Sequence, residues 1–344
     1  MKEFKNYEEQ LQLLKNRGLV ILNEELAYKR LIEENYYNII NGYKTPFLKD
    51  GKETDEFIDG TSFEDIYELY LFDRELRNIF LKRILHQENL LRSKISYIFS
   101  REHGHDNYLK LQNFDTLENN FTSTKETHEK RIKDIQRLIA DLQMDIVHSI
   151  DKKMYIKHYI NKYGFVPFWV VVNCITLGRL SNFYQLMKQS ERIEVSKHWG
   201  IQEKDLKQYI RVLAHYRNIC AHDDRFYNSK IDNFGINDTI YHEKIIIEKV
   251  NDRYRKGKND VFSLLIVFKI LLPHEEFLTL CNKIDGRMRS LETKIKSIDV
   301  TQIFDDMGFV KGWHRIKEMS IENDEITEQI TIEQFIDSII ENNK

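Results

Sequence analysis

The sequence predicts an all-α protein. Only three prolines and thirteen glycines occur in 344 residues, so few positions force the backbone out of a helix. Apolar residues recur at helical spacing over long stretches, whereas strand-like alternation is scarce and is suggested only for residues 239–241 and 244–247, which would pair briefly. Hydrophobic residues make up 41% of the chain, enough for one large core or two smaller ones.

Composition limits the kinds of partner. The formal net charge of -3 argues against a protein that coats nucleic acid, but it leaves room for a local basic patch. The most apolar stretch, residues 261–272, is shorter than the roughly 18 residues of a membrane span and contains Lys269. The charged start of the chain is not an apolar signal core, so we expect a cytoplasmic location without membrane association. Three cysteines far apart indicate neither disulfides nor a metal site, and no cofactor is expected.

The first half of the chain divides into helical segments separated by turn signals. Residues 7–15 and 23–40 predict helices on either side of a glycine, and together they form a small N-terminal unit over residues 1–58. Ser62 precedes acidic residues and a long apolar periodicity, which predicts either one long helix or two consecutive helices over residues 62–102.

The second half is also helical. Residues 124–162 carry an apolar stripe among mixed charges, the pattern of a helical arm. Residues 168–186 are so apolar that we expect the most buried helix there, and residues 203–222 form the next helix. Further apolar helices follow from residue 260, and the chain ends in a charged segment.

A cluster of polar residues near the end of the helix over residues 203–222 carries the clearest chemistry. Arg217, Asn218 and His222 form an Arg-Asn-x-x-x-His pattern. An arginine offers a fixed fork of donors to a phosphate, and a histidine can move a proton near neutral pH. With no cysteine pair or carboxylate cluster beside them, these residues suit chemistry on a phosphodiester.

The helix would place these residues on a polar stripe. His215, Asn218, His222 and Arg225 fall within about 40° of one line if the helix continues that far. The residues roughly opposite, which we expect to face the core, are Tyr209, Leu213, Tyr216 and Cys220.

The spacing of Arg217 and His222 is weak evidence by itself. Arg192 and His198 fit a similar loose pattern, and we interpret them as an accidental surface pair. A purely structural role is also open, in which Arg217 pairs with a buried carboxylate and His222 caps the carboxyl end of its helix.

Several separate segments, in order along the chain, resemble one family. The sequence is similar to the Abi-like abortive-infection proteins of bacteria (the AbiD and AbiF group), which belong to the HEPN superfamily of helical ribonucleases. The resemblance spans roughly residues 7–320. The matching segments are Asn35-Tyr36-Tyr37, Gly42-Tyr43-Lys44, residues 63–77, Glu88 with Arg92, Val166-Pro167-Phe168-Trp169, residues 217–222 and Met307-Gly308-Phe309.

The resemblance implies a HEPN-like four-helix core with a helical insertion and with N- and C-terminal helical extensions. The core would occupy residues 59–235, with an inserted arm over about 112–163, and the C-terminal extension residues 236–344. The implied core helices are residues 62–82, 84–103, 167–188 and 204–222. Such proteins place the Arg-to-His motif at the end of the last core helix, and two motifs meet across a homodimer.

The resemblance and the residue chemistry together predict an endoribonuclease of antiviral defence that needs no metal. The ribose 2′-hydroxyl would attack the adjacent phosphorus, with His222 as general base or acid, Arg217 holding the phosphate and Asn218 orienting either group. His215 and Arg225 on the stripe are accessory candidates. Glu88 and Arg92, one helical turn apart, either pair with each other or steady Arg217.

Two basic segments interleaved with tyrosines could contact RNA. Lys152, Lys153 and Lys157 belong to the first, and Arg253, Arg255 and Lys256 to the second. A solvated helix face and a charged loop explain them equally well. Some relatives have a structured non-coding RNA as partner, which such a patch would suit.

Two alternatives remain. The same helical dimer could bind a structured RNA or a protein without cleaving it. A helix-turn-helix over residues 7–43 could read DNA, but the acidic residues of that segment offset its basic ones, namely Glu24, Glu25, Glu33 and Glu34 against Lys15, Arg17, Lys29 and Arg30.

Overall fold

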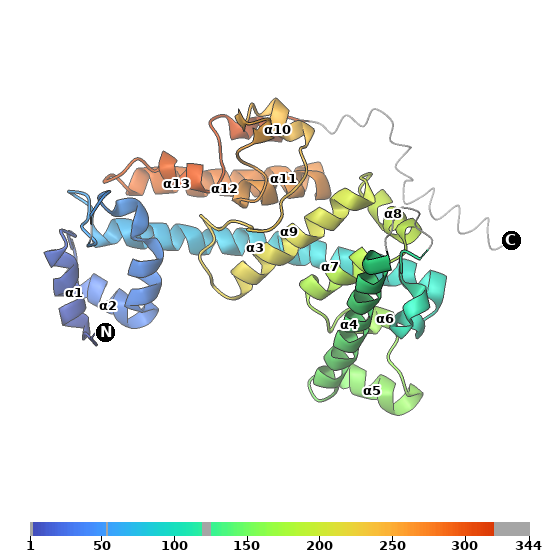
Figure 1. Ribbon diagram of the computed structural model, residues 1–344. Helices are drawn as coiled ribbons and strands as arrows, with labels where there is room; N and C mark the ends of the chain where they lie inside the picture. Colours follow the sequence, from blue (N-terminus) through green and yellow to red (C-terminus); the bar gives the residue numbers. More distant parts are fainter. Residues whose placement is uncertain (1–2, 53, 119–124, 320–344) are drawn as a thin grey trace.

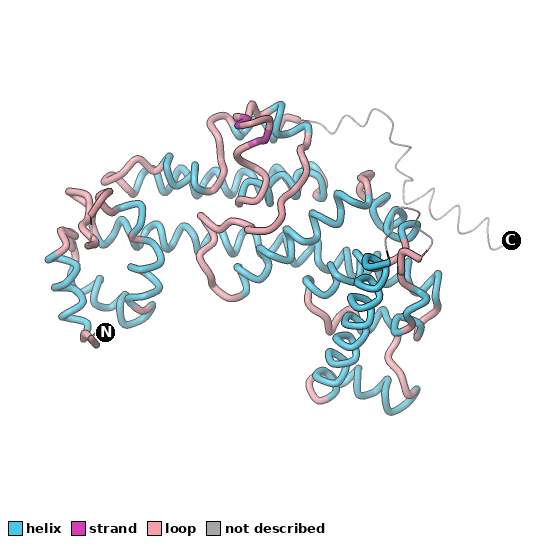
Figure 2. Tube along the Cα trace, in the orientation of Figure 1, coloured by secondary structure: helices cyan, strands magenta, loops and turns pink. Residues whose placement is uncertain are grey.

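The computed structural model describes residues 3–52, 54–118 and 125–319, and these are mostly helical, which confirms the all-α prediction (Figures 1 and 2). The α-helices are α1 Tyr7–Asn16, α2 Glu24–Glu34, α3 Phe63–His103, α4 Lys125–Ile150, α5 Met154–Tyr163, α6 Phe168–Val171, α7 Leu177–Leu186, α8 Gln189–Lys197, α9 Glu203–Ala221, α10 Ile240–Lys244, α11 Val261–Leu271, α12 His274–Lys294 and α13 Thr301–Asp306.

Short 3-10 turns and one small sheet complete the described chain. The 3-10 turns are η2 Thr45–Phe47, η3 Asn107–Leu109, η4 Leu111–Asn113 and η5 Trp313–Lys317, and η1 Tyr37–Asn41 is a π-helix. Strands β1 Lys249–Val250 and β2 Arg253–Tyr254 pair antiparallel. None of the described helices combines the length and the apolar character that crossing a membrane requires.

Helix α3 is the axis of the molecule. It is one continuous helix of 41 residues, about 60 Å long. Ser62 begins it with a reciprocal capping box to Asp65, and Gly104 ends it in a conformation with φ 83°. The two helices implied by the resemblance, residues 62–82 and 84–103, are therefore wrong as separate elements. No glycine or proline interrupts this stretch, so nothing breaks the backbone near residue 83.

The N-terminal helices are shorter than predicted. A single helix over residues 23–40 is wrong, because α2 ends at Glu34 and Asn35 adopts the positive φ of 68°. An asparagine tolerates this conformation better than most residues do. The chain then forms η1, whose Ile39 and Ile40 are fully buried.

The apolar segment after residue 167 is also divided. A short α6 is followed by a turn, and α7 starts afresh where the Thr176 side chain accepts the Arg179 N–H at 3.2 Å. Phe168 of α6 and Phe183 of α7 stack with ring centroids 4.3 Å apart, and both pack against Phe99 of α3. The predicted single helix over residues 168–186 is therefore two helices joined through one aromatic cluster.

The most buried helix lies elsewhere than predicted. In α11 every residue except Ile270 is buried, including Lys269, whose ammonium group lies over the Phe277 ring. The brief strand pair predicted for residues 239–241 and 244–247 is wrong, because residues 240–244 form α10 and the strands follow later.

The remaining elements lie around α3 (Figure 1). Helices α1 and α2 lie near its amino-terminal end, and α9 packs across it. Helices α10–α13 lie on one side of α3, and the arm of α4 and α5 projects on the other. The division into residues 1–58, 59–235 and 236–344 stays a prediction, and the charged end, residues 320–344, lies outside the described residues.

Candidate functional site

Helix α9 presents the cluster by burying its opposite face. The four residues expected to face the core, Tyr209, Leu213, Tyr216 and Cys220, are all buried, as predicted. Burial raises the pKa of the Cys220 thiol to about 12, so this cysteine is a packing residue and not a nucleophile. The packing leaves Asn218 and His222 exposed.

A buried carboxylate lies between two arginines beside this helix. Glu88 of α3 forms an ion pair with Arg92, one turn further along, and Glu88 Oε2 lies 3.7 Å from Arg217 Nε. Glu88 is only 5% exposed, whereas the Arg217 side chain is 31% exposed. Both alternatives foreseen for Glu88 are therefore present: it pairs with Arg92 and it also steadies Arg217.

The two candidate catalytic residues are oriented differently. Arg217 Nε is buried against α3, so the exposed part of the side chain is its far end, which carries the terminal nitrogens. Arg217 and His222 are five positions apart, or about 140° around a helix. Among the described residues no hydrogen bond or ion pair joins them. One chain thus supplies a phosphate-binding group and a proton carrier that do not touch.

His222 is the last residue of the helical turn. Its N–H donates to Asn218 O at 3.0 Å, and the next residue, Asp223, adopts φ 60°. The Asp224 N–H then donates to Ile219 O at 3.1 Å, a closure typical of a helix that ends in a left-handed residue. The helix does not reach Arg225, so the condition under which Arg225 would join the polar stripe is not met.

Arg225 instead binds the N-terminal unit, because its Nη1 donates a hydrogen bond to Gly42 O at 2.7 Å. His215 stays on α9, partly buried, with its Nε2 enclosed and without a hydrogen-bond partner. Desolvation lowers the pKa of His215, which favours the neutral ring. Arg225 is therefore exposed but bound to the N-terminal unit, whereas His215 is partly enclosed.

A buried polar network that the sequence did not single out holds the chain just after His222. Asp73 of α3 is fully buried and accepts hydrogen bonds from the Phe226 N–H at 3.0 Å, the Tyr227 N–H at 2.6 Å and the Tyr43 hydroxyl at 2.7 Å. Arg77 pairs with Asp73 at 2.6 Å and with Asp223 at 2.5 Å.

The network ties α3, the N-terminal unit and the end of α9 together. Burial raises the pKa of Asp73, and the Arg77 guanidinium and the hydrogen bonds oppose that rise. A signal for the pair existed in the sequence, because Asp73 and Arg77 have the i, i+4 spacing of a helical ion pair. Their partners after residue 222 could not be read from spacing.

The two predicted RNA-binding segments lie apart. Lys152 and Lys153 directly precede the arm helix α5, and Lys157 lies in its first turn. Strands β1 and β2, the second of which contains Arg253, lie on the other side of α3 (Figures 1 and 2). Lys256 of the hairpin is engaged by Asp305. The structure does not bring the two segments together.

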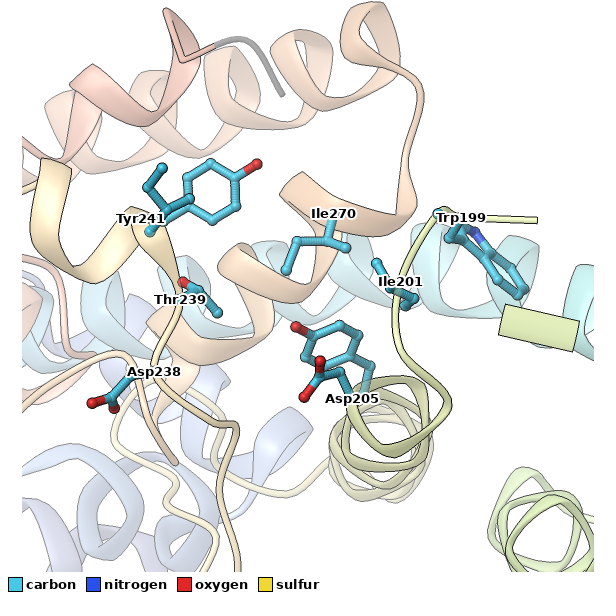
Figure 3. Close-up of a pocket in the computed structure, with 10 residues that line it drawn as sticks. Trp199, Ile201, Asp205, Asp238, Thr239, Tyr241 and Ile270 are labelled. Carbon is cyan, nitrogen blue, oxygen red and sulfur yellow. The ribbon is translucent and has the colours of Figure 1, made fainter. Parts of the chain in front are cut away.

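A cavity of about 250 Å³ lies near the amino-terminal end of α9 (Figure 3). Its lining includes Trp199, Asp205, Thr239, Tyr241 and Ile270. It contains none of the cluster residues. Within the described ranges, no group of three or more His, Cys, Asp and Glu residues is arranged to hold a metal ion.

Comparison with known proteins places the chain in a family. A family model described as Abi-like protein matches residues 29–228, from α2 through the loop that the buried network holds. No curated protein and no solved structure was found to match the chain. Because the family model covers more than half of the sequence and includes both α3 and the Arg217 cluster, the chain belongs to the family of Abi-like proteins.

Proposed function

We propose that this protein is an endoribonuclease of the HEPN superfamily that acts in bacterial abortive infection against phage. The Abi-like family supports the role in defence. The observation that supports the chemistry is the end of α9, where the partly exposed Arg217, held by Glu88, lies among the exposed Asn218 and His222.

The reaction is an intramolecular displacement on RNA. The ribose 2′-oxygen forms a bond to phosphorus as the bond from phosphorus to the 5′-oxygen breaks, leaving a 2′,3′-cyclic phosphate and a 5′-hydroxyl. His222 accepts the 2′-proton or donates a proton to the leaving oxygen. Arg217 stabilises charge on the non-bridging oxygens, and Asn218 orients the phosphate or the imidazole. The substrate supplies the nucleophile, so no metal-bound water is required.

The geometry favours a homodimer as the active species. One imidazole cannot easily serve as base and acid in the same displacement, and in one chain His222 lies about 140° around α9 from Arg217. A second copy of the chain would bring another His222 and another arginine to the same phosphate. A structured non-coding RNA, or another partner, would control this activity.

Cleavage of RNA by the purified protein in excess chelator tests this proposal, with the ends of the fragments mapped chemically. The wild-type protein should leave cyclic phosphate and 5′-hydroxyl ends, and the His222→Ala variant should leave RNA intact. His198→Ala is the matched control, because His198 is another exposed histidine. The predicted surface position of its partner Arg192 is wrong, since the Arg192 side chain is largely buried and pairs with Glu203 at 3.0 Å.

Two results would contradict the nuclease. Cleavage that stops with chelator, or that leaves other ends, would rule out the proposed reaction. Equal cleavage by the wild type and His222→Ala would rule out a catalytic role for His222. RNA bound by both proteins and cut by neither would favour the alternative, a binding protein in the same defence role that holds RNA or another protein without cleaving it.

A further inference from the structure

An acid-free segment forms the arm tip and the helices beside it. The whole chain contains 55 Asp and Glu residues, yet residues 152–190 contain none. The same residues contain Lys152, Lys153, Lys157, Lys162, Arg179 and Lys188. Arg179 is neutralised by Asp141 and Asp145 of α4, so the surplus positive charge lies mainly on α5 and on the residues just before it. This surface attracts phosphates although the protein as a whole is acidic.

Large aromatic rings are exposed on the same surface. Trp169 is 48% exposed, although its neighbour Phe168 is completely buried, and Tyr155 and Tyr163 of α5 are 41% and 50% exposed. By contrast, Trp313 elsewhere in the protein is 4% exposed. Exposed rings beside lysines offer faces on which unpaired bases can stack.

Two hydrogen bonds and a cation–π contact link the residues that carry these rings to the turn between α6 and α7. Lys153 Nζ donates to Asn173 O at 2.6 Å and lies 5.8 Å from the centre of the Tyr155 ring. The Asn173 side chain in turn donates to Trp169 O at 3.2 Å. Trp169 and Tyr155, from different helices, therefore flank a single lysine-bound turn.

The same turn is fixed to the Arg217 cluster from its other end. Arg92 Nη2 donates to Ile175 O at 2.8 Å, and Arg92 also pairs with Glu88, the carboxylate that holds Arg217. A chain of contacts runs from Arg217 through Glu88 and Arg92 to the Ile175 carbonyl of the turn. Asn173 of the same turn binds Lys153 and the Trp169 backbone. The α6–α7 turn, which Lys153 of the acid-free surface binds, is therefore two side chains removed from Arg217.

We propose that single-stranded RNA held at Arg217 runs across the α6–α7 turn onto α5, and that Trp169 stacks on an unpaired base along this path. Lys152, Lys157 and Lys162 neutralise phosphates beyond it. The proposal rests on the proposed function, and it names unpaired RNA as the substrate class. A duplex keeps its base faces stacked inside, so it cannot use these rings.

Equilibrium binding of a short fluorescein-labelled oligouridylate tests the path independently of cleavage. All variants carry His222→Ala, so a protein that never cleaves RNA still gives a result. Trp169→Ala should weaken binding about ten-fold, as expected for the loss of one stacked base, and Trp169→Tyr should recover most of the affinity. Tyr37→Ala is the matched control, because Tyr37 is 70% exposed in the N-terminal unit.

Three outcomes would overturn the path: equal affinity for the Trp169→Ala and Tyr37→Ala proteins, tighter binding of an RNA duplex of the same length than of the single strand, or binding of anionic lipid vesicles without binding of RNA. Loss of binding in Lys157→Glu together with Trp169→Ala would support it. Intrinsic tryptophan fluorescence gives a second readout, because stacking should quench it in the parent protein and not in Trp169→Tyr.

Discussion

Glu88 is the buried carboxylate that pairs with Arg217. It is buried between Arg92 and Arg217, and its Oε2 has no hydrogen bond to offset desolvation beyond the ion pair with Arg217. Removing one member of such a group leaves its partners as uncompensated charges, which costs more than the net gain from making the pair.

We therefore expect Glu88→Ala to lower the free energy of unfolding by about 3 kcal/mol and to abolish RNA cleavage. Chemical denaturation and the cleavage assay check the two effects. Glu33→Ala, which removes an exposed acid paired with Arg30 on α2, should change neither measurement appreciably. An unchanged stability in Glu88→Ala would contradict the arrangement of charges described here.

His215 makes the free energy of unfolding decrease as the pH falls. Its pKa is lowered by burial, so below about pH 6.5 the unfolded chain binds a proton that the folded protein resists. The contribution of His215 to stability is therefore complete above the unfolded pKa and is lost as the pH falls toward the folded value.

The His215→Asn variant cannot take up this proton, so its free energy of unfolding should decline less steeply than that of the wild type between about pH 7 and about pH 5. Urea denaturation across this range measures both slopes. Equal slopes would show that burial does not hold the ring neutral.

At the scale of elements, the end of α9 is held by α3 and not by its own sequence. Asp223 takes a left-handed conformation that a glycine would adopt more easily, and Arg77 holds it there. The Phe226 and Tyr227 N–H groups that follow donate to Asp73. The network thus fixes the backbone directly beyond His222.

Asp73→Asn removes the charge that pairs with Arg77 and one of the acceptor oxygens. The amides of Phe226 and Tyr227 should then exchange their hydrogens faster, and RNA cleavage should fall while binding of RNA persists. We expect a loss of about 2 kcal/mol in stability. Hydrogen exchange followed by mass spectrometry gives the local readout, with the more exposed Asp134→Asn on α4 as control. Unchanged exchange in residues 226–227 would contradict a positioning role for Asp73.

At the scale of the whole molecule, the N-terminal helices are built into the rest of the protein. Val20 exchanges backbone hydrogen bonds with the start of α3, and Glu34 accepts hydrogen bonds from Tyr70 at 2.6 Å and Arg74 at 3.0 Å. Tyr43 and the Gly42 carbonyl reach the network and the loop beyond α9. These contacts cross the predicted boundary at residue 58.

A chain that starts at residue 59 should therefore melt at a markedly lower temperature than the full chain, or fail to remain soluble, and it should not cleave RNA. Thermal melting followed by circular dichroism measures this. A truncated chain with the wild-type melting temperature would show that residues 1–58 are an independent unit.

Helical segments and candidate residues could be predicted because their signals are local. The periodicity of α9 placed Tyr209 and Tyr216 in the core and left Arg217 with His222 near its end. The break at Asn35 and the restart of α7 at Thr176 were missed, because a single asparagine or threonine is compatible with continuing a helix as well as with ending it.

The sequence by itself determined the all-α composition, the membership of the family and the set of side chains at the end of α9. These depend on hydrogen bonds and apolar spacing within a few residues of each other. Only the tertiary structure decided that Glu88 pairs with Arg217 and that Asp73 holds the chain beyond His222. The hydrogen bond from the Tyr227 N–H to Asp73 joins residues 154 positions apart. A buried charge pairs with the groups that lie close to it in the folded core, and these groups come close only after distant segments have packed together.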